Sequence, residues 1–299
     1  MPTIADLKQQ KVIVDAEIVD WRDRFYDITT GKDISVPSDA TAMEIIDKVR
    51  DTKMVIVKTD IKMRLFHCDT QSKEIYELNP DTLEAIKTVS SPSTYPRGIG
   101  GGWDGTKLRL FHTDEKTDKI YELNTDTLQS IKAVNSMDSS PYGIGGDWDG
   151  SRLRLFHCDR LRDRIYELNP DTLQSIKTVS GMSTEPSGIG GGYDGNKLRL
   201  FHCDIDAKKI YELNPDTLQP IKTVSSVHNS PRGIGGSWDG NKLRLFNCDG
   251  TKDKMYELNP NTLEAIKTVD GFNKIPSGIG GGHYLSKYVE YEGKKIFLT

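Results

Sequence analysis

The sequence GIGGGWDGTKLRLFHTDEKTDKIYELNTDTLQSIKAV, residues 98–134, returns almost unaltered every 45 residues along the 299-residue chain. Three further motifs recur in step with GIGG and without an insertion: RLF, YEL and IK. A fixed period of this length is typical of proteins that repeat one small structural unit. The GIGG motif begins at Gly98, Gly143, Gly188, Gly233 and Gly278.

Each repeat predicts four short antiparallel strands. The segments KLRLFHCD, KIYELN and QSIKTV are runs of strand-forming residues that are too short for helices. NPDT and WDG predict turns, because Pro fixes φ after the opening Asn and Gly accepts dihedrals that other residues avoid. With GIGGG as the remaining strand, each repeat is one blade of an all-β propeller.

The glycines of GIGGG are explained by their place in such a blade. The first strand of a propeller blade lies beside the central axis, and glycine inside a strand usually marks a close approach of two backbones. A phosphate-binding glycine loop would require a helix directly after the glycines, whereas a turn and a strand follow here. We therefore interpret GIGGG as the innermost strand.

The order of these motifs resembles the repeats of NHL- and YVTN-type β-propellers. Such repeats begin with Pro-x-Gly-Ile, pass through an Asp-Gly turn and a short strand that ends near Asp, and continue with a strand that leads into Asp-x-x-Thr. PSGIGG, YDG, LRL and KIYELNPDTL follow this order here, and the resemblance covers residues 53–282. It implies the fold and no particular activity, since propellers perform many functions. The glycine-rich inner strand and the FHCD strand ending depart from the family.

The number of blades depends on the two ends of the chain. Residues 53–63, KMVIVKTDIKM, occupy the place of GIGGGWDGTKL, so MVIV is interpreted as the first inner strand and residues 53–277 as five repeats. Residues 278–299 would then begin a sixth blade, with KYVEYE in register with KLRLF.

We expect residues 1–52 to complete this sixth, composite blade. They contain the predicted strand KVIVDAEIVDW, the segment RFYDITTGKDISV and a short helix in PSDATAMEIIDKVRD that Ser38 or Asp39 would cap. Such closure pairs strand edges that would otherwise be open. The alternative is five blades, in which the strand at Gly278 is the inner strand of the first blade and both tails form a small side domain.

Composition and charge argue against several kinds of partner. The net charge is −4 without long runs of one sign, so we expect no nucleic-acid binding. No apolar run approaches the roughly 18–20 residues of a membrane-spanning helix, so we expect no membrane insertion. The N-terminus MPTIADLKQQKVIVD does not have the pattern of a secretory signal.

The cysteines share one position of the repeat, so the fold should hold them apart. We expect reduced thiols, which favours a cytoplasmic location without establishing it. The cysteines are Cys68, Cys158, Cys203 and Cys248.

Histidine recurs just before these cysteines, and aspartate follows them. A His-Cys-Asp triplet raises the question of a metal site, but neighbouring residues on a strand point to opposite faces and cannot bind one ion together. We expect no metal, and a structural role in which His bonds a neighbouring turn and Asp caps the loop. The histidines are His67, His112, His157 and His202, with Asn247 in the fifth repeat.

Two sets of residues are candidates for ligand binding. The aromatic residues of the first turn would form a ring on one face, where they could stack on sugars, anchor a partner or simply pack against the next blade. These are Trp103, Trp148, Tyr193 and Trp238, with Thr59 and Tyr284 nearby in the outer repeats.

The second set stands before GIG, at the end of loops that vary between repeats, and loops on a rigid scaffold often carry function. This position holds Arg97, Tyr142, Ser187, Arg232 and Ser277, of which we select Arg97, Tyr142 and Arg232 as candidates.

The near identity of the blades favours binding over catalysis. The glycine-rich inner strands offer no asymmetric polar set for a catalytic site, and the sequence has no nucleophile elbow or carboxylate pair. The RLF arginines and YEL glutamates are expected to form structural ion pairs. We therefore predict a non-enzymatic, multivalent binding or scaffold propeller without a cofactor, lectin-like with one weak site per blade for a glycan, or else a platform for a protein partner. The alternative is a propeller hydrolase or lyase with its site at the central channel.

Overall fold

The computed structural model describes residues 25–27, 32–34, 54–136, 139–181, 184–226, 229–270, 275–291 and 294–297. The chain divides into two compact units, a propeller unit formed by Ile61–Tyr284 and a second unit formed by Met1–Asp60 and Leu285–Thr299. The predicted strand KVIVDAEIVDW and the helix expected in PSDATAMEIIDKVRD lie outside the described residues.

Four blades of the propeller unit are continuous in the chain, and each is a four-stranded antiparallel sheet in simple sequence order. Blade 2 contains β6 (Pro96–Trp103), β7 (Leu108–Asp114), β8 (Lys119–Leu123) and β9 (Ser130–Asn135). Blade 3 contains β10 (Pro141–Trp148), β11 (Leu153–Asp159), β12 (Arg164–Leu168) and β13 (Ser175–Ser180). Blade 4 contains β14 (Pro186–Tyr193), β15 (Leu198–Asp204), β16 (Lys209–Leu213) and β17 (Pro220–Ser225). Blade 5 contains β18 (Pro231–Trp238), β19 (Leu243–Asp249), β20 (Lys254–Leu258) and β21 (Ala265–Asp270).

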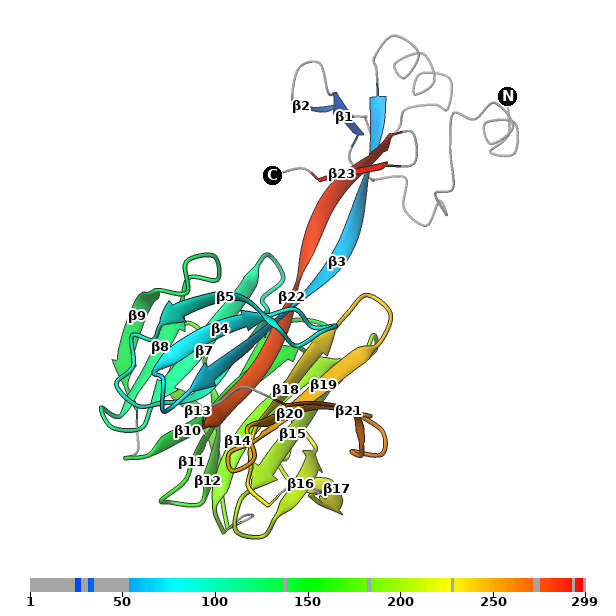
Figure 1. Ribbon diagram of the computed structural model, residues 1–299. Coiled ribbons are helices and arrows are strands. Elements are labelled where there is room, and N and C mark those ends of the chain that lie inside the picture. The colour runs from blue at the N-terminus through cyan, green and yellow to red at the C-terminus, as the bar shows by residue number, and fades with distance from the viewer. Residues whose placement is uncertain are drawn as a thin grey trace. The chain divides into compact units, whose positions relative to one another are not determined.

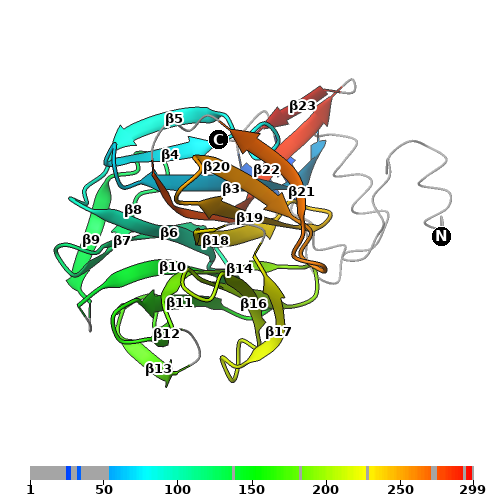
Figure 2. The ribbon, with the colours of Figure 1, turned by 60° about the horizontal axis from the view of Figure 1, so that its bottom comes forward.

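Blade 1 takes its strands from both ends of the repeat array. Its inner strand is the first part of β22 (Pro276–Tyr291), which pairs with β3 (Met54–Asp69), and β4 (Glu74–Leu78) and β5 (Ala85–Ser90) complete the sheet. Figures 1 and 2 show β22 beside the much earlier β3. The propeller therefore has five blades, which is the alternative stated above, and the expectation of six is wrong.

The error has a physical reason. The expectation of six blades gives MVIV and KYVEYE a strand each, but MVIV continues without a break into the second strand of blade 1, and KYVEY prolongs the inner strand. Both segments form strands as expected, but no turn separates either of them from the strand beside it in the sequence. The propeller fold itself is confirmed, whereas the NHL or YVTN subtype stays an interpretation.

A ring of glycine backbone closes after five strands. The middle glycine of each inner strand has no room for a Cβ atom: on Gly145 it would lie 3.0 Å from Cα of Gly190, and on Gly280 it would lie 2.8 Å from Cα of Gly100. Figure 2 shows these inner strands at the centre of the ring. The interpretation of GIGGG as the axial strand is thus confirmed, and the glycines in question are Gly100, Gly145, Gly190, Gly235 and Gly280.

The hydrophobic core lies between neighbouring blades. One cluster joins Phe156 and Ile165 of blade 3 to Leu200 and Leu213 of blade 4, and the same arrangement recurs at the other junctions, including that of blade 5 with blade 1. Each blade therefore covers the apolar face of the next one.

The RLF arginines join the blades further from the axis. Arg109 donates from Nε and Nη2 to the carboxylate of Glu122 in its own blade, at 2.8 and 3.0 Å, and from Nη1 to Asp171 of blade 3 at 2.6 Å. Arg244 of blade 5 reaches Asp81 of blade 1 in the same way, so this lattice also closes after five blades. The expected arginine–glutamate pairs are confirmed.

The described part of the second unit is a small sheet. Here β1 (Phe25–Asp27) pairs with β2 (Lys32–Ile34) and with Met54–Ile56 of β3, and the end of β22 pairs with β23 (Lys294–Phe297).

The glycine ring predicts a steep cost for a single methyl group. A Cβ atom on Gly143 would lie 2.5 Å from N of Ile189 and 2.8 Å from Cα of Gly188, both of them backbone atoms that cannot move aside. We expect Gly143→Ala to lower the free energy of unfolding by about 3 kcal/mol or more, measured by urea denaturation. The matched control is Gly181→Ala, because Gly181 has φ +77° and open space around it and should cost only about 1 kcal/mol. Equal costs would contradict the close approach at the axis.

Candidate functional site

The repeated histidines fasten the second strand of each blade to its inner strand. His112 Nδ1 lies 2.7 Å from the carbonyl oxygen of Gly98, and His202 Nδ1 lies 2.8 Å from that of Gly188. Asn247 makes the equivalent bond to Gly233 at 2.7 Å. A carbonyl oxygen can only accept, so Nδ1 carries a proton and donates it to the glycine carbonyl. Burial lowers the pKa of His67, His112 and His202 to about 4.

The aspartates that follow cap the next turn, as expected. Asp114 accepts from the backbone N–H groups of Thr94, Lys116 and Thr117. Within the described ranges, no three His, Cys, Asp or Glu side chains are grouped so that they could hold a metal ion.

The cysteines are free and buried, as expected. Burial raises the pKa of Cys158 and Cys248 to about 12, so their thiols stay protonated and unreactive at neutral pH.

The aromatic residues of the first turn are brought to one end of the inner strands, but not into one pocket. Trp103 is buried and its ring stacks on His283 with centroids 6.0 Å apart, so His283, not Tyr284, occupies the aromatic position of blade 1. The rings of Trp148 and Trp238 lie over Gly105 and Gly195 in the turn of the preceding blade. Trp148, Tyr193 and Trp238 remain partly exposed.

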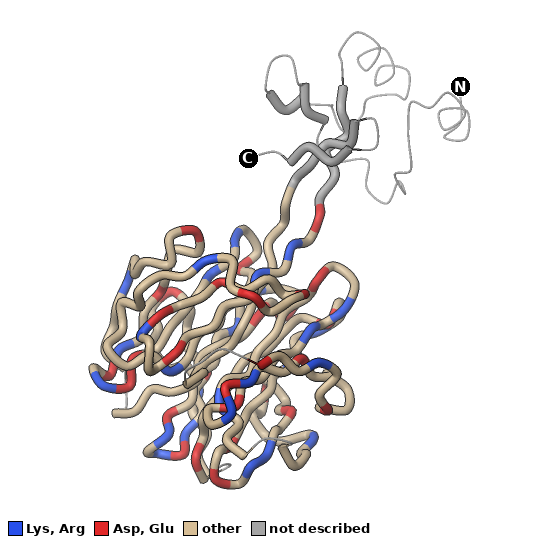
Figure 3. Tube along the Cα trace, in the orientation of Figure 1, with Lys and Arg blue, Asp and Glu red and all other residues tan. Residues whose placement is uncertain are grey.

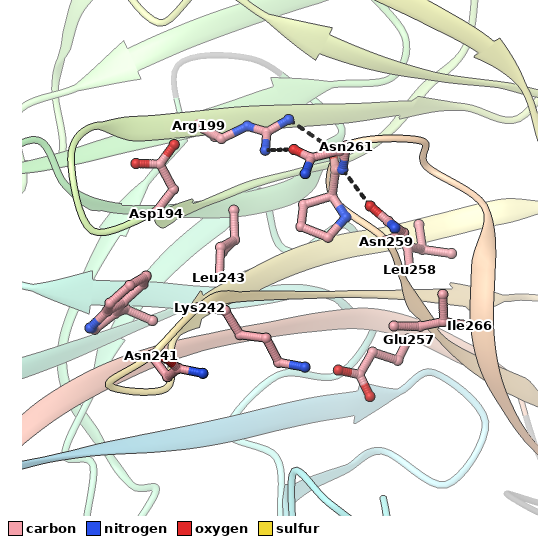
Figure 4. Close-up of a pocket in the computed structure, with 12 residues that line it drawn as sticks. Asp194, Arg199, Asn241, Lys242, Leu243, Glu257, Leu258, Asn259, Asn261 and Ile266 are labelled. Atoms are coloured by element: carbon pink, nitrogen blue, oxygen red, sulfur yellow. Dashed lines mark hydrogen bonds between the residues drawn. The ribbon is translucent and has the colours of Figure 1, made fainter.

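An open groove lies between blades 4 and 5 beside Trp238. It has a volume of about 450 Å³, and its lining includes Asp194 and Arg199 of blade 4 and Lys242 and Glu257 of blade 5. Figure 4 shows Lys242 pointing toward Glu257, with Arg199 and Asp194 on the opposite wall. A second groove of about 440 Å³, between blades 5 and 1, has no aromatic residue in its lining.

An asymmetric polar cluster, missed from the sequence, interrupts the glycine strands at this end of the axis. Asp147 stands where Gly102, Gly192 and Gly282 stand in other blades, and Ser237 occupies the same position in blade 5. Asp147 accepts from the backbone N–H groups of Trp103, Trp148 and Tyr193 at 2.9–3.2 Å. Its carboxylate therefore joins three blades.

His283 completes this axial cluster. Its Nδ1 lies 3.3 Å from Ser237 Oγ and 3.7 Å from Asp147 Oδ1, and all three side chains are buried. Burial raises the pKa of Asp147 and lowers the pKa of His283, and the attraction between the two groups opposes both shifts. The departures from GIGGGW at Asp147, Ser237 and His283 were the signal in the sequence that could have revealed the cluster.

The second candidate set meets at the other end of the inner strands. The guanidinium of Arg97 lies over the rings of Tyr95 and Tyr142, 4.5 Å from each centroid. Arg160 lies 5.2 Å from the Tyr142 ring and donates to its hydroxyl at 2.9 Å. Arg232 interacts electrostatically with Tyr142, Arg97 and Arg160. The structure thus unites Arg97, Tyr142 and Arg232 and adds Arg160, which the sequence analysis did not select.

Over the rest of the propeller, cationic and anionic residues are interspersed, as Figure 3 shows. No helix within the described ranges is long and apolar enough to cross a membrane.

Comparison with known proteins assigns no family to the chain. No protein-family model matches the sequence, and no curated protein matches it either. A chain in the crystal structure of a nidogen/laminin complex is 16% identical, with 73% of this chain and 98% of that one covered and a TM-score of 0.47. A chain of a mitotic checkpoint complex is 15% identical (76% and 71% covered, TM-score 0.41), and the glutaminyl cyclase of Myxococcus xanthus is 12% identical (75% and 77% covered, TM-score 0.45).

The buried neutral histidines predict a stability that falls in acid. A pKa of about 4 in the folded chain against 6.5 when unfolded means that unfolding takes up a proton, so the stability is full above pH 6.5 and is lost toward pH 4. Each such histidine contributes about 1.4 kcal/mol per pH unit within that window.

His202→Asn tests this, because Asn247 already makes the same bond in blade 5 and Nε2 of His202 has no partner to lose. Urea denaturation between pH 4.5 and 7.5 should show that the free energy of unfolding of the variant depends less steeply on pH, because unfolding takes up about one proton fewer. Carboxylate titration is common to both proteins and cancels in the difference. An identical pH dependence would show that His202 is not held neutral by the fold.

Proposed function

We propose that the protein is a multivalent carbohydrate-binding propeller, with sugars bound in the grooves between neighbouring blades. The propeller fold is consistent with a binding or scaffold role. The observation that carries the finer proposal is the groove between blades 4 and 5, where the partly exposed ring of Trp238 lies beside polar side chains from both blades.

The chemistry of this groove suits a sugar. An aromatic face stacks on the C–H groups of a pyranose ring, while hydroxyl groups need fixed donors and acceptors. Lys242 is a donor and Asp194 and Glu257 are acceptors at the groove wall. Asn261 accepts from Arg199 through Oδ1 at 2.8 Å, so its Nδ2 group can donate to a ligand.

The repeat places an equivalent tryptophan at one further junction. Trp148 is partly exposed and lies over Gly105 of blade 2. The ring of Tyr193 instead meets that of Trp238 edge-on, and its hydroxyl donates to the carbonyl oxygen of Gly195 in its own blade. Trp103 is buried at the first junction, and the lining at the last one lacks an aromatic residue. We therefore assign two sites, at Trp148 and Trp238, rather than one per blade, and weak sites of this kind bind more strongly together on a surface that displays many glycans.

The alternative is a hydrolase or lyase with its site at the central channel, and the geometry of the axial cluster argues against it. Ser237 and Asp147 both face the same nitrogen of His283, whereas a relay from a serine through histidine to a carboxylate uses both ring nitrogens. The three side chains are buried, and Asp147 already accepts backbone N–H groups from three blades.

A glycan array followed by titration calorimetry tests the proposal. The protein should bind immobilised glycans, and Trp238→Leu should bind one equivalent fewer of the matching monosaccharide and adhere more weakly to the array. Trp103→Leu is the control, since its buried ring also packs at the first turn but belongs to neither of the two assigned sites. A protein that binds no glycan, or an undiminished Trp238→Leu variant, would refute the proposal.

A further inference from the structure

Two positions per blade surround the axis at the end where the inner strands begin, and there the repeats differ most in chemistry. One is the residue before GIG, and the other directly follows the aspartate that ends the second strand. The backbone pairs the two segments alike in every blade, as in the bond from N of Gly250 to O of Ser230. The pairs, from blade 1 to blade 5, are Ser277 with Thr70, Arg97 with Glu115, Tyr142 with Arg160, Ser187 with Ile205, and Arg232 with Gly250.

Two of the three arginines in these pairs have a carboxylate partner. Arg97 Nε donates to Glu115 Oε2 at 2.6 Å, and Arg160 forms an ion pair with Glu185. Both guanidinium groups also flank the ring of Tyr142. Tyr142 accepts from Arg160, so its own O–H can still donate to another group.

Arg232 is the exception. Its pair residue is Gly250, and a Cβ atom on Gly250 would overlap the guanidinium of Arg232. Arg232 therefore occupies the space in which Glu115, the equivalent of Gly250, has its side chain in blade 2. Among the described residues no carboxylate pairs with Arg232, and its Nε is buried without a hydrogen-bond partner. Burial lowers the pKa of Arg232, and repulsion from Arg97 and Arg160 adds to this while Tyr142 opposes it. A half-buried cation whose Nε–H group is buried without an acceptor is costly to maintain in a folded protein.

We propose that Arg232, together with Arg97, Arg160 and the hydroxyl of Tyr142, binds the oxyanion group of a small ligand, a carboxylate or a phosphate, at the axis of the propeller. The bound anion takes the place that the carboxylate of Glu115 has in front of Arg97. A guanidinium presents two parallel N–H groups to two oxygens of such a group, which makes arginine the side chain best suited to it. The blades differ here, so the propeller has one such site, independent of the proposed sugar grooves.

Thermal unfolding of the full chain tests the proposal. The probes are sodium phosphate and sodium acetate, each compared with sodium chloride at equal ionic strength. Phosphate or acetate should raise Tm above the value in chloride, and the anion that does so identifies the class of oxyanion that the site binds. Arg232→Gln should weaken the apparent affinity for that anion about tenfold or more. Lys252→Gln, which removes an equal charge from an exposed position of the same blade, should keep the shift.

Gly250→Glu provides the converse test. Gly250 has no positive φ, so its backbone accepts a side chain. The Arg232 side chain must then shift to a position beside the new carboxylate, like that of Arg97 beside Glu115. The added carboxylate should pair with Arg232, raise Tm in chloride and abolish the anion-dependent shift. The proposal fails if neither anion shifts Tm of the parent protein, or if Arg232→Gln or Gly250→Glu retains the full shift.

Discussion

The contact of glycine backbones at the axis is the constraint on which the rest of the propeller depends. Adjacent inner strands approach so closely that a single Cβ atom would meet a neighbouring backbone, and this is true from Gly100 around to Gly280 and back. A narrow ring of few blades requires such a contact, since wider rings leave a channel that side chains can fill. Five inner strands, one of them from the far end of the chain, satisfy it.

Fixing the inner strands fixes what lies outside them. The His Nδ1–H groups and Asn247 fasten each second strand to a glycine carbonyl, which places the next apolar layer between blades. The RLF arginines lie further from the axis, where each one contacts the YEL glutamate of the same blade and a turn of the next blade. The glutamates are buried with the arginines, whereas Asp171 is 82% exposed, so the pair within the blade contributes more than the pair between blades.

Local features could be predicted from the sequence because they repeat. Four strands per blade, axial glycines, free thiols and arginine–glutamate pairs each depend on contacts within one repeat or between adjacent ones. The blade number depends on which distant strand pairs with Met63–Asp69, and strand-forming residues at both ends fit either answer. Asp147 and Ser237 are visible as departures from glycine, but only ring closure brings His283 to them.

The same argument separates two kinds of binding surface on one scaffold. Whatever the repeat specifies must occur several times, as the aromatic junctions do, and such sites are equivalent and individually weak. A site that occurs once must come from residues in which the blades differ, and the axis is where single positions from more than two repeats come together. Arg97, Tyr142 and Arg232 satisfy both conditions. Gly250 adds the third feature of a specific site, since its missing side chain leaves Arg232 without the carboxylate that Arg97 has.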